Sequence, residues 1–450
     1  MVTTQALLIG LLLAALVGQA IVPQARLLIV TLAAALAGAV ATGFGIATTS
    51  TLLAEVPWGV LVMLVGLGLL ADMLAASRLF GLLAATLART AGGDPRLLIP
   101  LLAGGMFVVS GLVNNLTALV LVLPPVLALL RLMPVSQRYA SWLLGMMIVA
   151  CNLGGAATPI GDFPAILLLG SGSLAFTDYL INALPAASLA LVVLLIVVDV
   201  AVRPTRGLSD DAVSRRLSVL VLADFYRRVR LEARILVPAA CLLIAMMAAW
   251  MIIPPSSGIG PDLICWLGVV IALLSRAHLG ERLIRTSIDM QSVLFLLSLF
   301  IMVGAVRHTG VFTDIAGWLA AMPIPAMAKL LVFIVVAAVL TGLFSAGPSM
   351  AALLEVAPAL TVTLPKTAVY VGLALGVCAG SSLFLTAATS GPLAMALTER
   401  AAITADDGRP VRFGAIEYLP VGLTAFGIIL VVALIAAAAI VALAPLTGMP

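Results

Sequence analysis

Apolar runs of about 20 residues recur from one end of the chain to the other, separated by short polar or Gly- and Pro-containing segments. A helix of this length crosses the ~30 Å hydrocarbon core of a bilayer. The pattern therefore predicts uninterrupted membrane spans at residues 4–22, 27–47, 57–77, 180–202, 235–253, 260–275, 289–308 and 416–445.

Four further apolar segments are interrupted near their middle. Segments 97–130 and 326–362 each carry a polar tip, which predicts a re-entrant helical hairpin that enters and leaves the membrane on one side. Segments 139–170 and 367–398 each carry a polar, Gly-rich break, which predicts a discontinuous transmembrane helix. Unwound backbone survives at membrane depth only where protein or a cavity satisfies its polar groups, so such breaks indicate binding sites.

Composition supports an integral membrane protein. Hydrophobic residues make up 63% of the chain and charged residues 9%, whereas soluble domains carry about 25% charged residues. The net charge of +4 lies in short loops, so we expect the bilayer as a partner and no nucleic acid. The cysteines and histidines form no cluster with metal-ligand spacing, so we expect no cofactor apart from a coupling ion, sodium or proton.

The basic residues predict an orientation in the cell inner (plasma) membrane. With the N-terminus outside and the loops alternating, 20 of the 23 Lys and Arg fall inside, and only Arg307, Lys329 and Lys366 fall outside. This bias is what the positive-inside rule requires. It places the Arg-rich linker 203–234 in the cytoplasm, where we expect it to be solvated.

The two halves of the chain resemble each other. "SRLFGLLAATLA" (77–88) resembles "TGVFTDIAGWLA" (309–320), and "SGLVNNLTALVLVLPPVLAL" (110–129) resembles "TGLFSAGPSMAALLEVAPAL" (341–360). The first half starts outside and the second inside. We therefore expect an all-α integral membrane protein built as a 5+5 inverted repeat, with repeats at 1–202 and 235–450 joined by the linker 203–234.

Polar side chains gather at the tip and break of the first half. They are Ser110, Asn114, Asn115 and Thr117 at the tip, and Asn152, Thr158 and Asp162 at the break, where Gly161 is one of the helix breakers. Buried amides in lipid need partners, and a charge at the bilayer centre costs about 2.5–3.5 kcal/mol even on lenient scales. Asp162 therefore favours cation or proton binding. The alternative is a carboxylate that caps the following half-helix.

The second half carries mostly hydroxyl groups at the same places. Its candidates are Ser345 and Ser349 at the tip with Pro348 between them, and Ser382, Thr386 and Thr389 at the break. Small hydroxyl residues also serve close helix packing, which is the alternative for each of them. Glu355, on the returning arm of the second hairpin, is a further candidate for proton coupling or a structural acid.

"SGLVNNLTALVLVLPP" and "NLGGAATPIGDFPAIL" resemble the first hairpin and helix-break motifs of the ion transporter superfamily. That group includes arsenite permeases, NhaD-type sodium/proton antiporters, citrate transporters and divalent-anion/sodium symporters. The resemblance implies a dimerising scaffold, an elevator-like movement, and substrate and sodium held by the tips and breaks, with Asn115 and Asp162 as sodium ligands. Asn114 stands where antiporter-like members often have Asp, and Ala346 occupies the position of Asn115 in the second hairpin.

These features predict an ion-coupled secondary transporter and no enzyme. In sodium/proton antiport, Asp162 exchanges a proton for sodium. In transport of a small anion such as citrate, a dicarboxylate or an arsenite-like oxyanion, Asp162 holds the coupling ion. No Lys or Arg lies in a tip or break, which favours antiport or a neutral substrate. An ion channel is a distant alternative.

Overall fold

The computed structural model describes residues 2–22, 25–206, 208, 212–227, 229–254, 257–388 and 390–447. This part of the chain is helical and contains no strand, only an isolated bridge between Thr404 and Pro410. Ten of its helices are at least 18 residues long and apolar enough to cross a membrane. The expected all-α membrane protein is confirmed.

The uninterrupted spans lie close to where the hydrophobic pattern predicts them. They are α1 (Val2–Ile21), α2 (Arg26–Gly43), α4 (Trp58–Ala76), α10 (Phe176–Val197, continued by the π-helical turn Val198–Val202), α12 (Ala233–Ile252), α13 (Pro261–Leu274), α15 (Met290–Arg307) and α22 (Ala415–Thr447). Short helices that the pattern did not single out join them: α3 (Thr49–Ala54), α5 (Leu79–Thr90), α14 (Ala277–Thr286) and α16 (Val311–Ala321).

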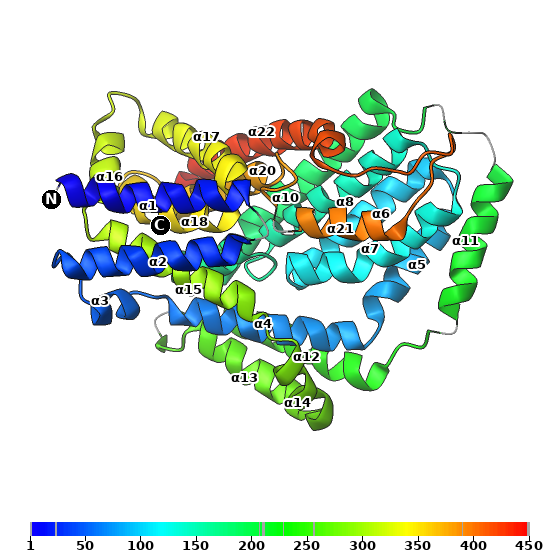
Figure 1. Cartoon of the computed structure of the whole chain (residues 1–450), viewed down its shortest axis with the longest axis horizontal. Helices are drawn as coiled ribbons and strands as arrows, with labels where there is room; N and C mark the ends of the chain where they lie inside the picture. Colours follow the sequence, from blue (N-terminus) through cyan, green and yellow to red (C-terminus); the bar gives the residue numbers. More distant parts are fainter. Residues whose placement is uncertain are drawn as a thin grey trace.

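Both hairpins and both discontinuous helices are present. The first hairpin is α6 (Pro95–Leu112) and α7 (Asn115–Leu132); the second is α17 (Ala326–Phe344) and α18 (Ala346–Val356), followed by the short α19 (Pro358–Thr361). The first broken helix is α8 (Gln137–Ala157) and α9 (Phe163–Gly170), and the second is α20 (Lys366–Ser381) and α21 (Gly391–Ala401). Figure 1 shows the two hairpins toward opposite ends of the molecule.

The two halves exchange helices. From α1 to α10 and again from α12 to α22 the elements follow in the same order. Within this order, α2 packs on α15 of the other half, and its counterpart α13 packs on α4 of the first. The same exchange joins α9 to α18 and α21 to α7. Helices of the two halves therefore interdigitate in the folded protein.

Each hairpin crosses its broken helix at a glycine. A β-carbon on Gly154 of α8 would lie 2.2 Å from the carbonyl oxygen of Phe107, and one on Gly380 of α20 would lie 2.2 Å from that of Ala338. Only glycine allows helix backbones to approach so closely. This contact brings each hairpin tip against the adjacent break.

The linker between the halves is partly folded, in contrast to the solvated linker that its arginines suggested. Helix α11 (Ala212–Arg227) packs on α5 and α7. Val219 and Leu222 are buried, and the Ser218 hydroxyl donates to the carbonyl of Leu132 at 2.6 Å. These residues lie on one face of a helical turn, so the segment is amphipathic and docks through that face.

Candidate ion-binding site

The first break ends in an acid that caps a half-helix. Asp162 is the residue before α9, and its Oδ1 accepts a hydrogen bond from the Phe163 N–H at 2.8 Å. The capping interpretation of Asp162 is therefore correct. Capping occupies one oxygen only, and the half-buried carboxylate keeps acceptor capacity for a cation.

The first hairpin tip is bonded directly to this break. The Asn115 N–H donates to the carbonyl of Gly161 at 3.2 Å, and the Thr158 hydroxyl donates to the carbonyl of Gly111 at 2.6 Å. The Asn115 side chain, 1% exposed, lies beside Asp162. The structure thus brings five of the predicted residues into one cluster: Ser110, Asn115, Thr158, Gly161 and Asp162.

A buried hydroxyl joins the first tip to α8. The Ser110 hydroxyl lies 2.7 Å from the carbonyl oxygen of Cys151 and also contacts the side-chain Oδ1 of Asn115. The Nδ2 group of Asn115 has no hydrogen-bond partner among the described residues. The Asn115 amide therefore lies between Ser110 and Asp162.

The second tip and break carry hydroxyls without partners. Ser349 and Ser390 are buried, and neither side-chain oxygen has a hydrogen-bond partner within the described residues. Ser390 precedes α21 as Asp162 precedes α9, yet it makes no capping bond. Ser345 forms the tip with φ 88° and ψ 154°, a conformation that is strained for any residue except glycine. Thr389 lies outside the described residues.

The two breaks meet at Asn152. Its side-chain Nδ2 lies 3.3 Å from the Ser381 carbonyl and 3.2 Å from the Ser382 hydroxyl. The second tip also reaches the first break, because a β-carbon on Gly347 would lie 3.5 Å from the ring of Phe163. Both tips and both breaks therefore converge on one region.

Tyrosines from the closing spans cap the broken helices in the same way. The hydroxyl of Tyr179 in α10 donates to the carbonyl of Ala156 at 2.8 Å. The hydroxyl of Tyr418 in α22 donates to the carbonyl of Ser382, also at 2.8 Å. Each bond satisfies a carbonyl at a half-helix end that has no intrahelical partner.

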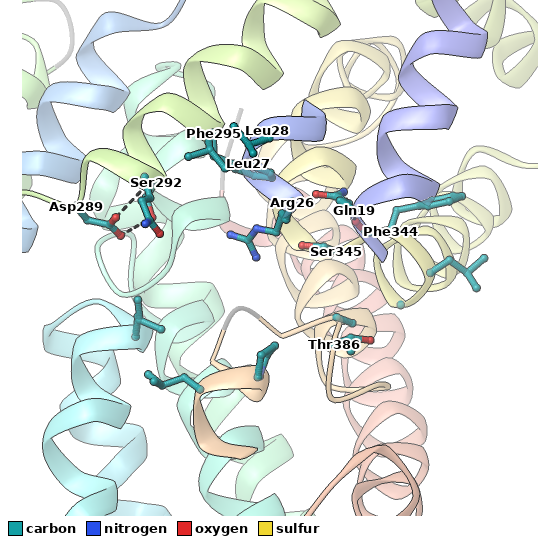
Figure 2. A pocket seen from close by; sticks show the side chains of 17 residues that line it. Gln19, Arg26, Leu27, Leu28, Asp289, Ser292, Phe295, Phe344, Ser345 and Thr386 are labelled. Atoms are coloured by element: carbon teal, nitrogen blue, oxygen red, sulfur yellow. Dashed lines mark hydrogen bonds between the residues drawn. The ribbon is translucent and has the colours of Figure 1, made fainter. Parts of the chain in front are cut away.

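A cavity of about 640 Å³ opens between the second tip and the starts of α2 and α15. Figure 2 shows Arg26 pointing into it, with Ser345 and Thr386 along the same cavity. The tips and breaks themselves contain no basic residue, but Arg26 reaches this space from a helix distant in sequence. Sequence reasoning assigned it to a loop and gave no signal of its position.

Other predicted residues lie elsewhere or serve local structure. Asn114 caps α7, its Oδ1 accepting from the Leu116 N–H at 2.8 Å, and Thr117 and Pro348 lie in the first turns of α7 and α18. Glu355 forms an ion pair with Arg307 at 3.3 Å. Arg307 ends α15, whose 18 residues span about 27 Å, so Glu355 lies far from the cavity at the other end of that helix. No group of three metal-ligating His, Cys, Asp or Glu occurs in the described part of the chain.

Comparison with known proteins agrees with this architecture. A sequence model described as citrate transporter matches residues 7–377. The chain belongs to the citrate transporter family. Its fold is similar to that in the crystal structure of the Alcanivorax borkumensis YdaH transporter, which has an unusual topology, with a TM-score of 0.60 over 87% of both chains at 16% identity.

Proteins similar in sequence to this chain include transporters and membrane proteins of several organisms. An uncharacterised transporter of Mycobacterium bovis is 29% identical over 262 residues, and the match spans 58% of each chain. The magnetosome protein MamN of Paramagnetospirillum magneticum is 28% identical over 80% of this chain and 82% of its own. Sodium/proton antiporter 2 of Arabidopsis thaliana is 26% identical over 50% of this chain and 53% of its own.

Proposed function

We propose that this citrate transporter family member is an ion-coupled secondary active transporter with an elevator-type mechanism of alternating access. The coupling cation, sodium or proton, binds at the Asp162 carboxylate of the first break, beside the side chain of Asn115. As a part of the proposal, the protein is a homodimer in the inner (plasma) membrane with the N-terminus outside.

One observation carries the cation site. The Asp162 carboxylate lies at a helix break against the buried side chain of Asn115, and no Lys or Arg of the described residues forms an ion pair with it. An uncompensated carboxylate at membrane depth is costly. A bound cation or proton removes that cost, and oxygen ligands suit a hard cation.

The packing supports movement of the tips and breaks as one unit. The first tip is bonded to the first break, and Asn152 joins that break to the second. Helices α1, α2 and α15, by contrast, pack on one another. A displacement of the joined unit along these helices would expose the cation site to each side in turn.

Two transport reactions are compatible with these sites. Sodium/proton antiport needs only the cation site, and an antiporter is among the relatives. Coupled transport of a small anion, such as citrate, a dicarboxylate or an oxyanion, is favoured by Arg26 in the cavity and by the family itself.

The test is sodium- and proton-driven flux in proteoliposomes. Asp162→Asn keeps a side chain that can cap α9 but removes the charge, so the folded protein should persist while coupled flux falls about 100-fold. Asn115→Ala should weaken sodium activation in the same direction. The control is Asp178→Asn, which removes an exposed carboxylate on α10. Full sodium-coupled flux in Asp162→Asn would refute the cation site.

A further inference from the structure

The cavity beside the second tip contains Arg26, which the Asp289 carboxylate attracts from the same cavity without forming an ion pair with it. Within the described residues, no ion pair joins Arg26 to a carboxylate. Asp289 also lines the cavity, but its two oxygens accept hydrogen bonds from the N–H and hydroxyl of Ser292. The guanidinium therefore lacks a directly bonded counter-anion.

An aromatic ring fixes the guanidinium in place. The Cζ of Arg26 lies 4.8 Å from the centroid of the Phe295 ring, which holds one face of the planar group by a cation–π contact. The N–H donors lie in the plane of the guanidinium, so this contact leaves them free for a ligand. Figure 2 shows the group directed into the cavity.

The cavity combines the N–H donors of the Arg26 guanidinium with polar groups of the second tip and second break. Ser345 of the second tip and Thr386 of the second break line it, and Gln19 of α1 bonds the carbonyl of Phe344 beside the tip at 3.3 Å. A guanidinium binds a carboxylate through two parallel hydrogen bonds, and hydroxyls accommodate its remaining oxygens. The ligand that fits is a small carboxylate anion.

We infer that Arg26 is a specificity-determining residue that binds the carboxylate of a transported anion in one conformation of the cycle only. The inference rests on the proposed elevator function. Arg26 belongs to α2, which packs on α1, α3 and α15, whereas Ser345 and Thr386 belong to the unit that moves. Displacement of that unit carries the anion away from Arg26. The anion is therefore bound more tightly from the side on which Arg26 lies.

The orientation expected from the arginine distribution makes that side cytoplasmic. The wild-type transporter should show a lower half-saturation constant for the anion at its cytoplasmic face than at its external face. The maximal rates compensate for this difference, because flux without a gradient must balance in both directions.

The experiment measures uptake of radiolabelled citrate and succinate by oriented proteoliposomes from each face. Arg26→Gln should lower the ratio of external to cytoplasmic half-saturation constants about 10- to 100-fold, the worth of a lost charged hydrogen bond. Arg26→Lys should recover part of the ratio, because the charge remains without the fork. Arg285→Gln, an exposed charge on α14 outside the cavity, should leave the ratio unchanged.

Sodium activation separates this inference from the transport function. Arg26→Gln should keep the sodium dependence that Asp162→Asn removes. An unchanged ratio in Arg26→Gln, or equal weakening from both faces, would overturn the role of Arg26 while transport stands. Wild-type sodium/proton exchange without citrate or succinate flux would also overturn it. Absence of all coupled flux in the wild type would refute the transport function itself.

Discussion

The first and second breaks share their backbone packing but carry different polar residues. A β-carbon on Gly154 or on Gly380 would lie 2.2 Å from a carbonyl oxygen of the crossing hairpin. The hydroxyls of Tyr179 and Tyr418 each donate to a half-helix carbonyl at 2.8 Å. The halves differ at the residue that precedes the second half-helix, α9 or α21. The first break ends in the capping acid Asp162, and the second in Ser390, a buried hydroxyl without a partner.

The difference shows which part of an inverted repeat is constrained by packing. Backbone crossings fix glycines in both halves, since any side chain there meets a carbonyl. Asp162 and Ser390 precede equivalent half-helices but differ in chemistry, so each half can carry its own ligands. One half has acquired a charge and the other hydroxyls, which suits the binding of two chemically different species.

The largest expected effect tests the close backbone crossing that both halves share at Gly154 and Gly380. Gly154→Ala and Gly380→Ala each place a methyl group 2.2 Å from a carbonyl oxygen of the crossing hairpin, so both should unfold or fail to accumulate, with a loss of about 3 kcal/mol or more. Purification yield and thermal unfolding in detergent measure this. Gly104→Ala in α6 is the control, because its β-carbon meets nothing within 4 Å. A stable variant at either crossing would show that this half is packed less closely.

A smaller, matched effect is expected at the tyrosines. Tyr179→Phe and Tyr418→Phe each remove one buried hydrogen bond to a half-helix end, so each should lower the free energy of unfolding by about 1–2 kcal/mol. Denaturation by SDS in mixed micelles measures both. A cost in one half only would mean that water or another group replaces the hydroxyl in the other.

The smallest effect concerns the residue before α5 and its counterpart before α16. Arg78 has φ 65° and Gly310 has φ 82° at the same place in the repeat. Arg78→Gly should raise the free energy of unfolding by about 1 kcal/mol, and Gly310→Ala should lower it by a similar amount. No atom lies within 4 Å of a β-carbon at Gly310, so the second change tests backbone conformation alone. Opposite signs in the same unfolding assay would confirm the repeat; equal signs would contradict it.

The fold was predictable because its signals are local. The length and hydrophobicity of the apolar runs predicted the spans that the structure contains, and Gly and Pro residues predicted where two helices break. The clustering of Asn115 with Asp162 was expected from the resemblance to the ion transporter superfamily, in which tips and breaks hold the ions together. Arg26 was not predictable as a cavity residue, since its place depends on α2 packing against α15. The ion pair of Glu355 with Arg307 likewise depends on tertiary structure, as does docking of α11.

The exchange of helices between the halves bears on how the protein is made. When synthesis has reached α10, the helices α2 and α4 have not yet met α15 and α13, which pack against them in the finished protein. The alanine-rich face of α2, which includes Ala33, Ala37 and Ala41, then has no second-half helix to cover it. The nascent half must remain protected in the membrane until the rest of the chain is inserted. The halves expressed as separate polypeptides should therefore escape proteolysis only when both are present.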